Sequence, residues 1–189
     1  MKVSVGISNR HIHLTEEDYK ILFQDEKLEV VKPINQPGQF ASNKFVTLKG
    51  EKGEIEHVRV LGPFRSYTQV EISKTDAFKL GVNPPVRESG DVLGSEKITI
   101  IGTQGTLENK ECCIIADRHI HILKEQAKMY NLDDVEEVSV MIDGEKGGII
   151  NHVKLRVSDS SYFEMHLDTD DANAHLVKNG DLVEIIKVP

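Results

Sequence analysis

Apolar and polar residues alternate along most of the chain in short runs, with turn residues between the runs. The runs KVSVGIS and CCIIAD are typical of strands, because successive side chains on a strand point to opposite faces. A short helical pattern follows each of them, and Thr15 is expected to cap the first helix. The stretch VKPINQPGQFASNKF predicts an irregular loop. The pattern as a whole predicts a mainly β protein with short helices.

An internal repeat organises these elements. RHIHLTEEDYKILF, from Arg10, corresponds to RHIHILKEQAKMYN, from Arg118. Further along, GEKGEIEHVRV matches GEKGGIINHVKL, and EISKTDA matches HLDTDDA. Each GEKG segment is a Gly-containing turn between two alternating runs, which predicts a β-hairpin in each copy. Short strands with few helices favour two tandem-duplicated small β-barrels.

Composition and charge exclude several classes of protein. The chain has 189 residues, 39% of them hydrophobic, and a formal net charge of −8. Lys and Arg are scattered, which argues against nucleic-acid binding. No apolar run is long enough for a membrane span, and the start of the chain does not resemble a secretory signal. We expect a cytoplasmic protein that binds neither nucleic acid nor membrane.

The two cysteines, Cys112 and Cys113, are adjacent in a predicted strand. Neighbouring strand residues face opposite ways, so the pair is not expected to hold one metal ion. No disulfide framework is present. We expect two small, semi-buried strand residues without a chemical role.

Each copy of the repeat contains the sequence His-Ile-His. Residues i and i+2 of a strand share a face, so His11 and His13 can point at one metal ion, as can His119 and His121. One such pair is weak support, but its repetition at equivalent positions strengthens the prediction. Zinc accepts imidazole and carboxylate ligands, and catalytic zinc typically has three protein ligands. Cobalt or iron would also suit these residue types.

The repeat also predicts the third ligands. Aligning EISKTDA with HLDTDDA places Glu71 opposite His166. Two sites follow: His11, His13 and Glu71, and His119, His121 and His166. The alternatives are that Glu71 is a solvated strand residue and that His166 is a core histidine. His57 and His152 are also equivalent, and a repeated packing position is favoured for them over metal ligation.

Arg65 follows the turn formed by Gly62 and Pro63, which the second copy lacks. It stands a few residues before Glu71, and a guanidinium suits bidentate phosphate binding. The alternative is a surface charge in a loop. The sequence has no phosphate-binding loop, dinucleotide fingerprint or nucleophile elbow, and no Cys near the histidines. Any acyl transfer is therefore expected to be metal-assisted and direct, without an acyl-enzyme.

Taken together, SNRHIHL, LGPFRSYTQVEIS, ADRHIHI and HLDTDDANA resemble the PduL-type phosphate acyltransferases, along essentially the whole chain. The resemblance implies reversible transfer of an acetyl or propanoyl group between coenzyme A and phosphate, with two zinc ions per chain. It implies Arg65 as the catalytic phosphate-binding residue. It also implies coenzyme A contacts, which are Ser8, Arg59, Leu61, His166 and Asn173.

The resemblance further implies a fold and an assembly. Two barrels would exchange strands, with residues 1–9 and 117–189 in one, 10–116 in the other, and the metal site between them. A homodimer is expected. Family members packaged in bacterial microcompartments carry an N-terminal extension, whereas the first motif here begins at Arg10. This difference favours a free cytoplasmic enzyme.

Two other functions stay open on the residues alone. A dinuclear zinc hydrolase of phosphate esters or thioesters would use the same ligands, but its activity would not depend on added phosphate. The other is a metal-binding or assembly domain without turnover. A closed four-ligand shell would favour this domain, whereas three ligands and an open position would argue against it.

Overall fold

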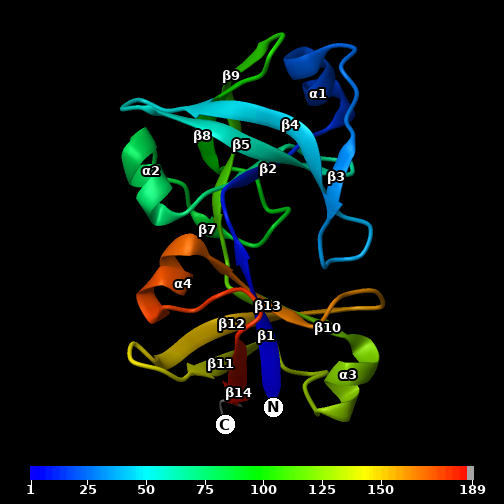
Figure 1. The fold of residues 1–189 in the computed structure, drawn as a ribbon, viewed down its shortest axis with the longest axis vertical. Helices are drawn as coiled ribbons and strands as arrows, with labels where there is room; N and C mark the ends of the chain where they lie inside the picture. The colour runs from blue at the N-terminus through cyan, green and yellow to red at the C-terminus, as the bar shows by residue number, and fades with distance from the viewer. Residues whose placement is uncertain (187–189) are drawn as a thin grey trace. The chain divides into compact units, whose positions relative to one another are not determined.

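The computed structural model describes residues 1–186, and they form strands and short helices in two compact units (Figure 1). Asn9–Ala116 form one unit, here the first barrel, and Met1–Ser8 with the chain from Asp117 onward form the other, here the second barrel. No helix among the described residues is long and apolar enough to cross a membrane.

The first barrel is a closed ring of six strands in the order β4-β5-β2-β6-β9-β8, with β8 pairing back to β4. The short strands β3 and β7 extend it by pairing with β4 and β9. Its elements are β2 (His11–His13), α1 (Glu16–Phe23), β3 (Val30–Pro33), β4 (Phe40–Lys49), β5 (Glu54–Gly62), β6 (Gln69–Glu71), α2 (Lys74–Leu80), β7 (Val86–Arg87), β8 (Glu96–Ile101) and β9 (Thr106–Ala116).

The second barrel is also closed, in the order β1-β13-β10-β12-β11-β14. Figure 1 shows α3 and α4 on different sides of this barrel. Its elements are β1 (Lys2–Ser8), β10 (His119–Leu123), α3 (Lys124–Met129), β11 (Glu137–Ile142), β12 (Gly148–Ser158), β13 (Glu164–Asp168), α4 (Thr169–His175) and β14 (Leu182–Ile186).

The barrels exchange strands, as expected. β1 precedes the first His-x-His motif, yet it pairs with β13 and β14 of the second barrel. β9 precedes the second motif, yet it belongs to the first barrel, where it pairs with β6 and β8. The mainly β fold of two duplicated, strand-exchanging barrels is therefore confirmed.

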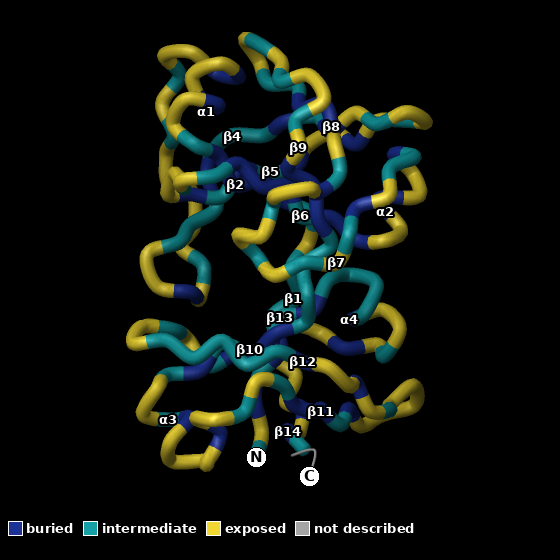
Figure 2. The backbone as a smooth tube through the Cα atoms, turned by 180° about the vertical axis from the view of Figure 1, so that it is seen from behind, coloured by how far each residue is buried: buried dark blue, intermediate teal, exposed yellow. Residues whose placement is uncertain are grey.

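Each barrel has its own hydrophobic core, made by the inward side chains of its strands (Figure 2). The middle residue of each motif, Ile12 or Ile120, is fully buried in one of these cores. Because side chains alternate along a strand, burying the isoleucine sends the two flanking histidines to the opposite face together. The apolar packing of one residue thus orients the two candidate ligands.

Helix capping follows the sequence. Thr15 caps α1, as predicted, because its side chain accepts a hydrogen bond from the Asp18 N–H. Ser73 and Asp168 cap α2 and α4 in the same way. These two helices begin directly after the strands that carry Glu71 and His166.

Two expectations were wrong in detail. The stretch VKPINQPGQFASNKF is not an irregular loop throughout, because it begins within strand β3 (Val30–Pro33), which pairs with β4, and ends within β4 (Phe40–Lys49). The chain accommodates Pro33 at this position because β3 is an edge strand, so the N–H groups on its outer side need no partner strand. The two cysteines are fully buried in the core of the first barrel instead of semi-buried.

Candidate metal centres

The structure brings the first three candidate ligands together within the first barrel. His11 lies directly across the antiparallel β2–β6 ladder from Glu71, and His13 lies two residues along on the same face. Each side chain offers one ligand atom, and the three atoms lie within 4.8 Å of one another. His11 Nε2 is 3.5 Å from Glu71 Oε2.

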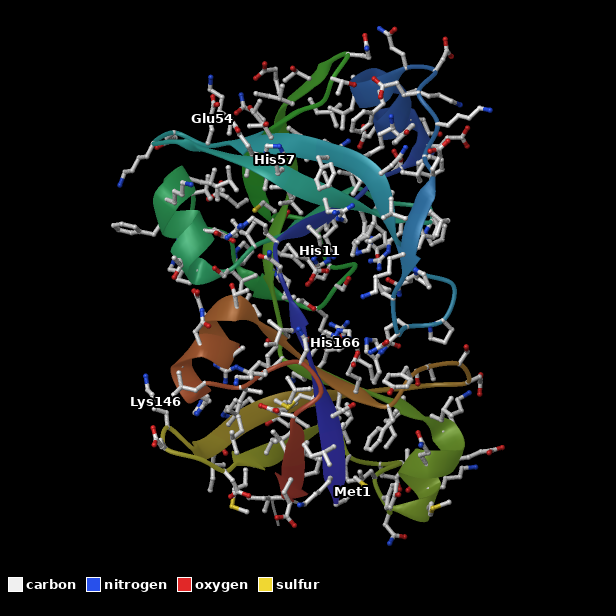
Figure 3. All side chains as sticks on the ribbon, in the orientation of Figure 1. Met1, His11, Glu54, His57, Lys146 and His166 are labelled. Atoms are coloured by element: carbon white, nitrogen blue, oxygen red, sulfur yellow. The ribbon has the colours of Figure 1, made fainter. Side chains whose placement is uncertain are left out.

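The second three candidate ligands meet in the same way within the second barrel. His119 lies across the antiparallel β10–β13 ladder from His166. The ligand atoms of His119, His121 and His166 lie within 4.8 Å of one another. Their three rings are mutually close, with centroid separations of 4.8–5.0 Å. His11 and His166 are labelled in Figure 3.

A backbone hydrogen bond of the first histidine of each motif makes Nε2 the ring nitrogen that can bind a metal ion; in His119 this atom accepts from Arg156 Nη1 at 3.2 Å. His11 Nδ1 is 2.8 Å from the carbonyl oxygen of Asn9, and His119 Nδ1 is 2.8 Å from that of Asp117. A carbonyl only accepts, so Nδ1 carries the proton and Nε2 keeps its lone pair. This arrangement is the usual way in which a protein fixes the tautomer of a ligating histidine.

Two further observations fit a metal ion. His13 is almost fully buried, and its Nδ1 has no hydrogen-bond partner within the described residues. A buried polar atom without a partner is costly, and a metal ion would satisfy it. The donor atoms at both groups are imidazole nitrogens and a carboxylate oxygen, which zinc accepts.

Electrostatics keep most of these imidazoles neutral. Burial, then the neighbouring His11 and Arg65, hold the pKa of His13 well below its ordinary value. Burial and Arg156 lower the pKa of His119 in the same way. For His121, burial and His166 lower the pKa to about 4. A neutral imidazole is the form that binds metal, so His13, His119 and His121 are ready to ligate at neutral pH.

His11 is the exception among these imidazoles. Burial lowers its pKa, but the charge and hydrogen bond of Glu71 outweigh burial and raise it above the ordinary value. The carboxylate therefore has a strong attraction for positive charge at this point. A bound cation would take the place of that proton.

Arg65 is positioned beside the first group by its own backbone. Its N–H donates to the carbonyl of Leu14, 2.9 Å away and just beyond β2. Its guanidinium donates to Ser89 Oγ at 3.2 Å, to Tyr67 Oη at 3.3 Å and to Gln39 Oε1 at 3.3 Å. Arg65 is therefore held by neutral partners, which leave its charge uncompensated by these contacts.

Ser89 and Gln69 connect Arg65 to Glu71. Ser89 Oγ donates to Glu71 Oε1 at 3.3 Å, and Gln69 Nε2 donates to the same oxygen at 2.6 Å. Gln69 Oε1 accepts from the N–H of Gly90 at 2.6 Å. Gln69 stands in the TQVE sequence beside Glu71, so a role at the site could have been predicted for it. Nothing in the sequence marks Ser89 as a site residue, because it lies in an irregular segment that is separated in sequence from Arg65, Gln69 and Glu71.

The expected coenzyme A contacts are placed as follows. Ser8 is half-buried and pairs with Asp168, the residue that caps α4, and Asn173 is exposed on α4. Leu61 is half-buried and lies opposite His13 in the β2–β5 ladder. Arg59 is engaged within its own barrel, because its guanidinium stacks 4.2 Å from the Phe45 ring centroid and donates to the Ser42 carbonyl.

Two charged residues of the second group were not predicted. Arg156 Nη1 lies 3.2 Å from His119 Nε2, and Glu164 Oε2 lies 2.9 Å from His166 Nε2. Arg156 and Glu164 pair with His121 from the strands on either side of it. Their equivalents in the first copy are Leu61 and Gln69, so the alignment of the repeats gave no signal for charge here.

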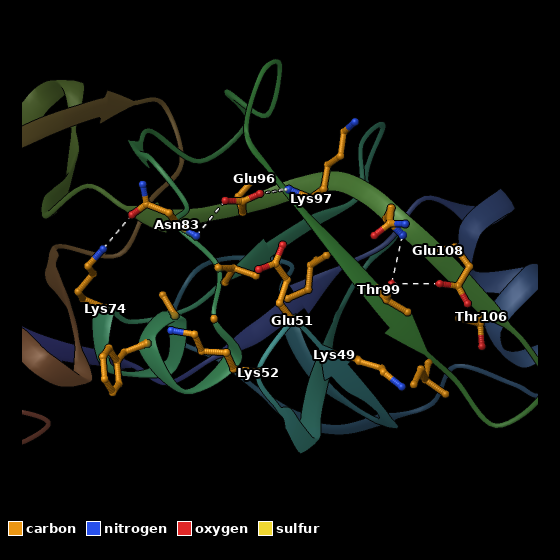
Figure 4. Close-up of a pocket in the computed structure, with 18 residues that line it drawn as sticks. Lys49, Glu51, Lys52, Lys74, Asn83, Glu96, Lys97, Thr99, Thr106 and Glu108 are labelled. Carbon is orange, nitrogen blue, oxygen red and sulfur yellow. Dashed lines mark hydrogen bonds between the residues drawn. The ribbon is translucent and has the colours of Figure 1, made fainter.

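A pocket of about 860 Å³ lies elsewhere on the first barrel (Figure 4). It is lined by the turn after β4, by α2 and by β8 and β9, and it includes none of the predicted site residues. Lysines and glutamates are mixed along its wall, so no single charge dominates it.

Comparison with known proteins identifies the family to which the chain belongs. The family model for phosphate propanoyltransferase matches residues 4–178. A phosphate propanoyltransferase of Thermotoga maritima is 49% identical over 98% of this chain and 89% of its own length. Proteins with the same description from Rhodopseudomonas palustris and Salmonella typhimurium are 46% and 44% identical, over 98% and 91% of this chain and 83% and 82% of their own lengths. The chain belongs to the phosphate propanoyltransferase family, a family of transferase enzymes.

Proposed function

We propose that this chain is a zinc-dependent phosphate acyltransferase. It would transfer a short acyl group, acetyl or propanoyl, between coenzyme A and inorganic phosphate, reversibly. Family membership supports the reaction class. The observation that carries the chemistry is the connection of Arg65, through Ser89, to Glu71 of the first histidine group. An anion-binding guanidinium beside candidate metal ligands is what a phosphate substrate requires.

Two zinc ions per chain would be held by His11, His13 and Glu71, and by His119, His121 and His166. Bound zinc supplies positive charge that polarises a carbonyl and stabilises a thiolate. The chain itself orients the ligands, through the carbonyls of Asn9 and Asp117 and the amide of Gln69. Three protein ligands at each group leave room for substrate, as in catalytic sites.

Arg65 would bind and orient the phosphate. Gln39, Tyr67 and Ser89 fix the guanidinium, so little side-chain freedom is lost on binding. A phosphate oxygen attacks the thioester carbonyl, the new C–O bond forms, and the C–S bond breaks with coenzyme A leaving as thiolate. The charge of Arg65 also offsets repulsion between phosphate and Glu71. Arg65 is thus the catalytic residue of the proposal.

Transfer would be direct, without an acyl-enzyme. Cys112 and Cys113 are the strongest potential nucleophiles among the side chains, and both are fully buried. Burial raises the pKa of Cys112 to about 12, so its reactive thiolate is suppressed at neutral pH. Phosphate itself is therefore the acceptor of the acyl group.

The proposal extends to substrate contacts and assembly. Ser8, Arg59, Leu61, His166 and Asn173 would contact coenzyme A, and the enzyme would act in the cytoplasm as a homodimer. Arg59 would have to keep its stacking on Phe45 while doing so. Sedimentation of the purified chain tests the dimer directly.

The deciding experiment is an assay of zinc-loaded protein with acetyl-, propanoyl- and butanoyl-coenzyme A, with and without phosphate. We expect coenzyme A release that requires phosphate, with acyl phosphate formed in equal amount, and activity that disappears after chelation and returns with zinc. Release of coenzyme A without phosphate would instead identify a hydrolase. Metal binding with no turnover on any of the three thioesters would identify a binding domain.

A further inference from the structure

The two histidine groups differ in one row of side chains across three neighbouring strands. In each barrel, this row is centred on the second histidine of the motif, and the flanking residues pair with it from either side. The row is neutral in the first barrel and carries both charges in the second; its members are Leu61, His13 and Gln69 in the first, and Arg156, His121 and Glu164 in the second.

The carboxylate stands at a different position in each of the two groups. In the first barrel the carboxylate is a candidate ligand, Glu71, and the neutral Gln69 donates a hydrogen bond to it. In the second barrel the candidate ligand is His166, and the carboxylate is Glu164, two residues earlier on β13. Each group therefore keeps one carboxylate, but only the first offers it among the three candidate ligands.

Glu164 contacts His166 directly. Its Oε2 lies 2.9 Å from His166 Nε2, and the glutamate is almost fully buried. A carboxylate that accepts the N–H of an imidazole fixes its tautomer and its ring orientation, and makes the other nitrogen a better metal ligand. His119 has a backbone carbonyl for this purpose. His166 has Glu164.

Gly6 of β1 makes room for this carboxylate. It pairs with His166 in the parallel β1–β13 ladder. A Cβ atom at Gly6 would lie 2.7 Å from Glu164 Cδ and 2.8 Å from Oε2. Such distances are too short, so a side chain at position 6 would force the carboxylate to move. The strand exchanged between the barrels thus brings the residue that permits this contact.

We infer that Glu164 is a positioning residue for the second metal centre: it holds His166 through Nε2, presents the other ring nitrogen to the metal, and depends on Gly6 for its place. The inference rests on the proposed function, which supplies the metal. It adds an outer-sphere carboxylate to that centre.

The test compares full-length wild type, Glu164→Ala, Glu164→Gln and Gly6→Ala by zinc competition with a chelator. We expect wild type to bind two zinc ions. In Glu164→Ala, one of the two should bind about 10–100-fold more weakly while the other is unchanged. Glu164→Gln can still accept the Nε2 proton and should recover most of the affinity. Gly6→Ala keeps the carboxylate but displaces it, so it should weaken the same zinc ion.

Ser4→Ala, two residues from Gly6 on the same strand and face, is the matched control and should leave both affinities unchanged. Cobalt(II) substitution gives a second readout. The visible spectrum of Glu164→Gln should keep the wild-type band shape if Glu164 lies outside the coordination sphere. A changed band shape would make Glu164 a direct ligand and overturn the inference, as would wild-type zinc affinity in both Glu164→Ala and Gly6→Ala.

The same experiment separates this inference from the proposed function. Wild type that binds two zinc ions and turns over, with unaltered variants, would overturn the role of Glu164 alone. Wild type that binds no zinc would overturn both. If Glu164→Ala fails to fold, Gly6→Ala and Glu164→Gln still decide the question, because both retain a polar side chain at position 164.

Discussion

The guanidinium of Arg10 donates two hydrogen bonds of 2.8 Å to the carboxylate of Asp76, across 66 residues of sequence. Arg10 immediately precedes the first His-x-His motif, and Asp76 lies in the first turn of α2, shortly after Glu71. The pair therefore ties the strand that carries two candidate ligands to the helix that follows the third. Arg118 and Asp171 make the equivalent contact in the second barrel, with one bond of 2.7 Å.

Arg10→Ala should destabilise the protein more than Arg118→Ala. The side chain of Asp76 is 5% exposed and that of Asp171 is 25% exposed. Removing Arg10 leaves the buried carboxylate of Asp76 without its charged partner, which should lower the free energy of unfolding by about 2 kcal/mol. Removing Arg118 from the more exposed pair should lower it by about 1 kcal/mol. Urea unfolding followed by circular dichroism measures both. Arg10→Lys, which keeps charge but not the fork, should fall between wild type and Arg10→Ala. A larger loss for Arg118→Ala would contradict this ranking.

Arg65→Ala should lower turnover far more than it lowers zinc content. The guanidinium contacts Ser89, Tyr67 and Gln39 but none of the candidate metal ligands in those bonds. We expect turnover to fall by about 100-fold or more, as when one stabilising donor is lost from a transition state. Arg65→Lys should recover little, because an ammonium lacks the planar fork. The measurement is the phosphate-dependent assay with metal analysis of the same sample.

Arg87 provides the matched control for Arg65. It is an arginine of the same barrel, half-exposed, whose guanidinium pairs with Asp91 at 3.1 Å. Arg87→Ala should leave turnover and zinc content unchanged. Near-normal turnover in Arg65→Ala would remove its catalytic role, whereas a parallel loss of zinc would make it a structural residue.

The sequence predicted the two ligand groups because they depend on short-range rules. Strand periodicity puts His11 and His13 on one face, and duplication pairs Glu71 with His166. The two barrels were predicted for the same reason, since hairpins and caps are local features. Strand exchange came from the family resemblance and not from any local pattern.

The sequence could not predict contacts between distant segments. Arg10 and Asp76 are both ordinary surface-type residues in sequence, and only the closed barrel brings them together. Ser89 reaches Arg65 and Glu71 from an irregular segment that has no repeat partner. Arg156 and Glu164 were missed because the repeat has neutral residues at the equivalent positions, and alignment reports likeness but not exchange of charge.

Cys112 should resist alkylation in the folded protein. It is fully buried, and burial raises the pKa of its thiol from 9.0 to about 12. Only the thiolate reacts, so iodoacetamide should modify folded protein at the rate at which it unfolds. Mass spectrometry after timed exposure, with a urea-unfolded sample as control, measures this. Fast modification of the native protein would contradict the burial.

The same thiol predicts the direction of an alkaline pH effect. The unfolded chain loses the Cys112 proton near pH 9.0, and the folded chain holds it until about pH 12. Between these values the folded state binds more protons, so the free energy of unfolding should fall as pH rises. Cys112→Ala should show a shallower decline over this range. An equal decline in that variant would assign the effect to other groups.

His57 and His152 should prove to be positions of backbone geometry and not metal ligands. Both have a φ of 57°, and the strand register shifts beside each of them, as in a β-bulge. Their side chains are 82% and 81% exposed, and His57 is labelled in Figure 3. Neither belongs to a candidate metal group among the described residues.

Glycine adopts positive φ without strain, whereas alanine does not. His57→Gly should therefore be more stable than His57→Ala by about 1 kcal/mol, and the same order should hold at position 152. Urea unfolding of the four variants measures this difference. Glu56→Gly, at the neighbouring position, should show the opposite effect and destabilise, because Glu56 does not have a positive φ and glycine there only adds backbone freedom to the unfolded chain. All four histidine variants should keep wild-type zinc content. Loss of zinc in His57→Gly would make that histidine a ligand after all, and equal stability of the Gly and Ala variants would mean that φ does not explain why this histidine is repeated.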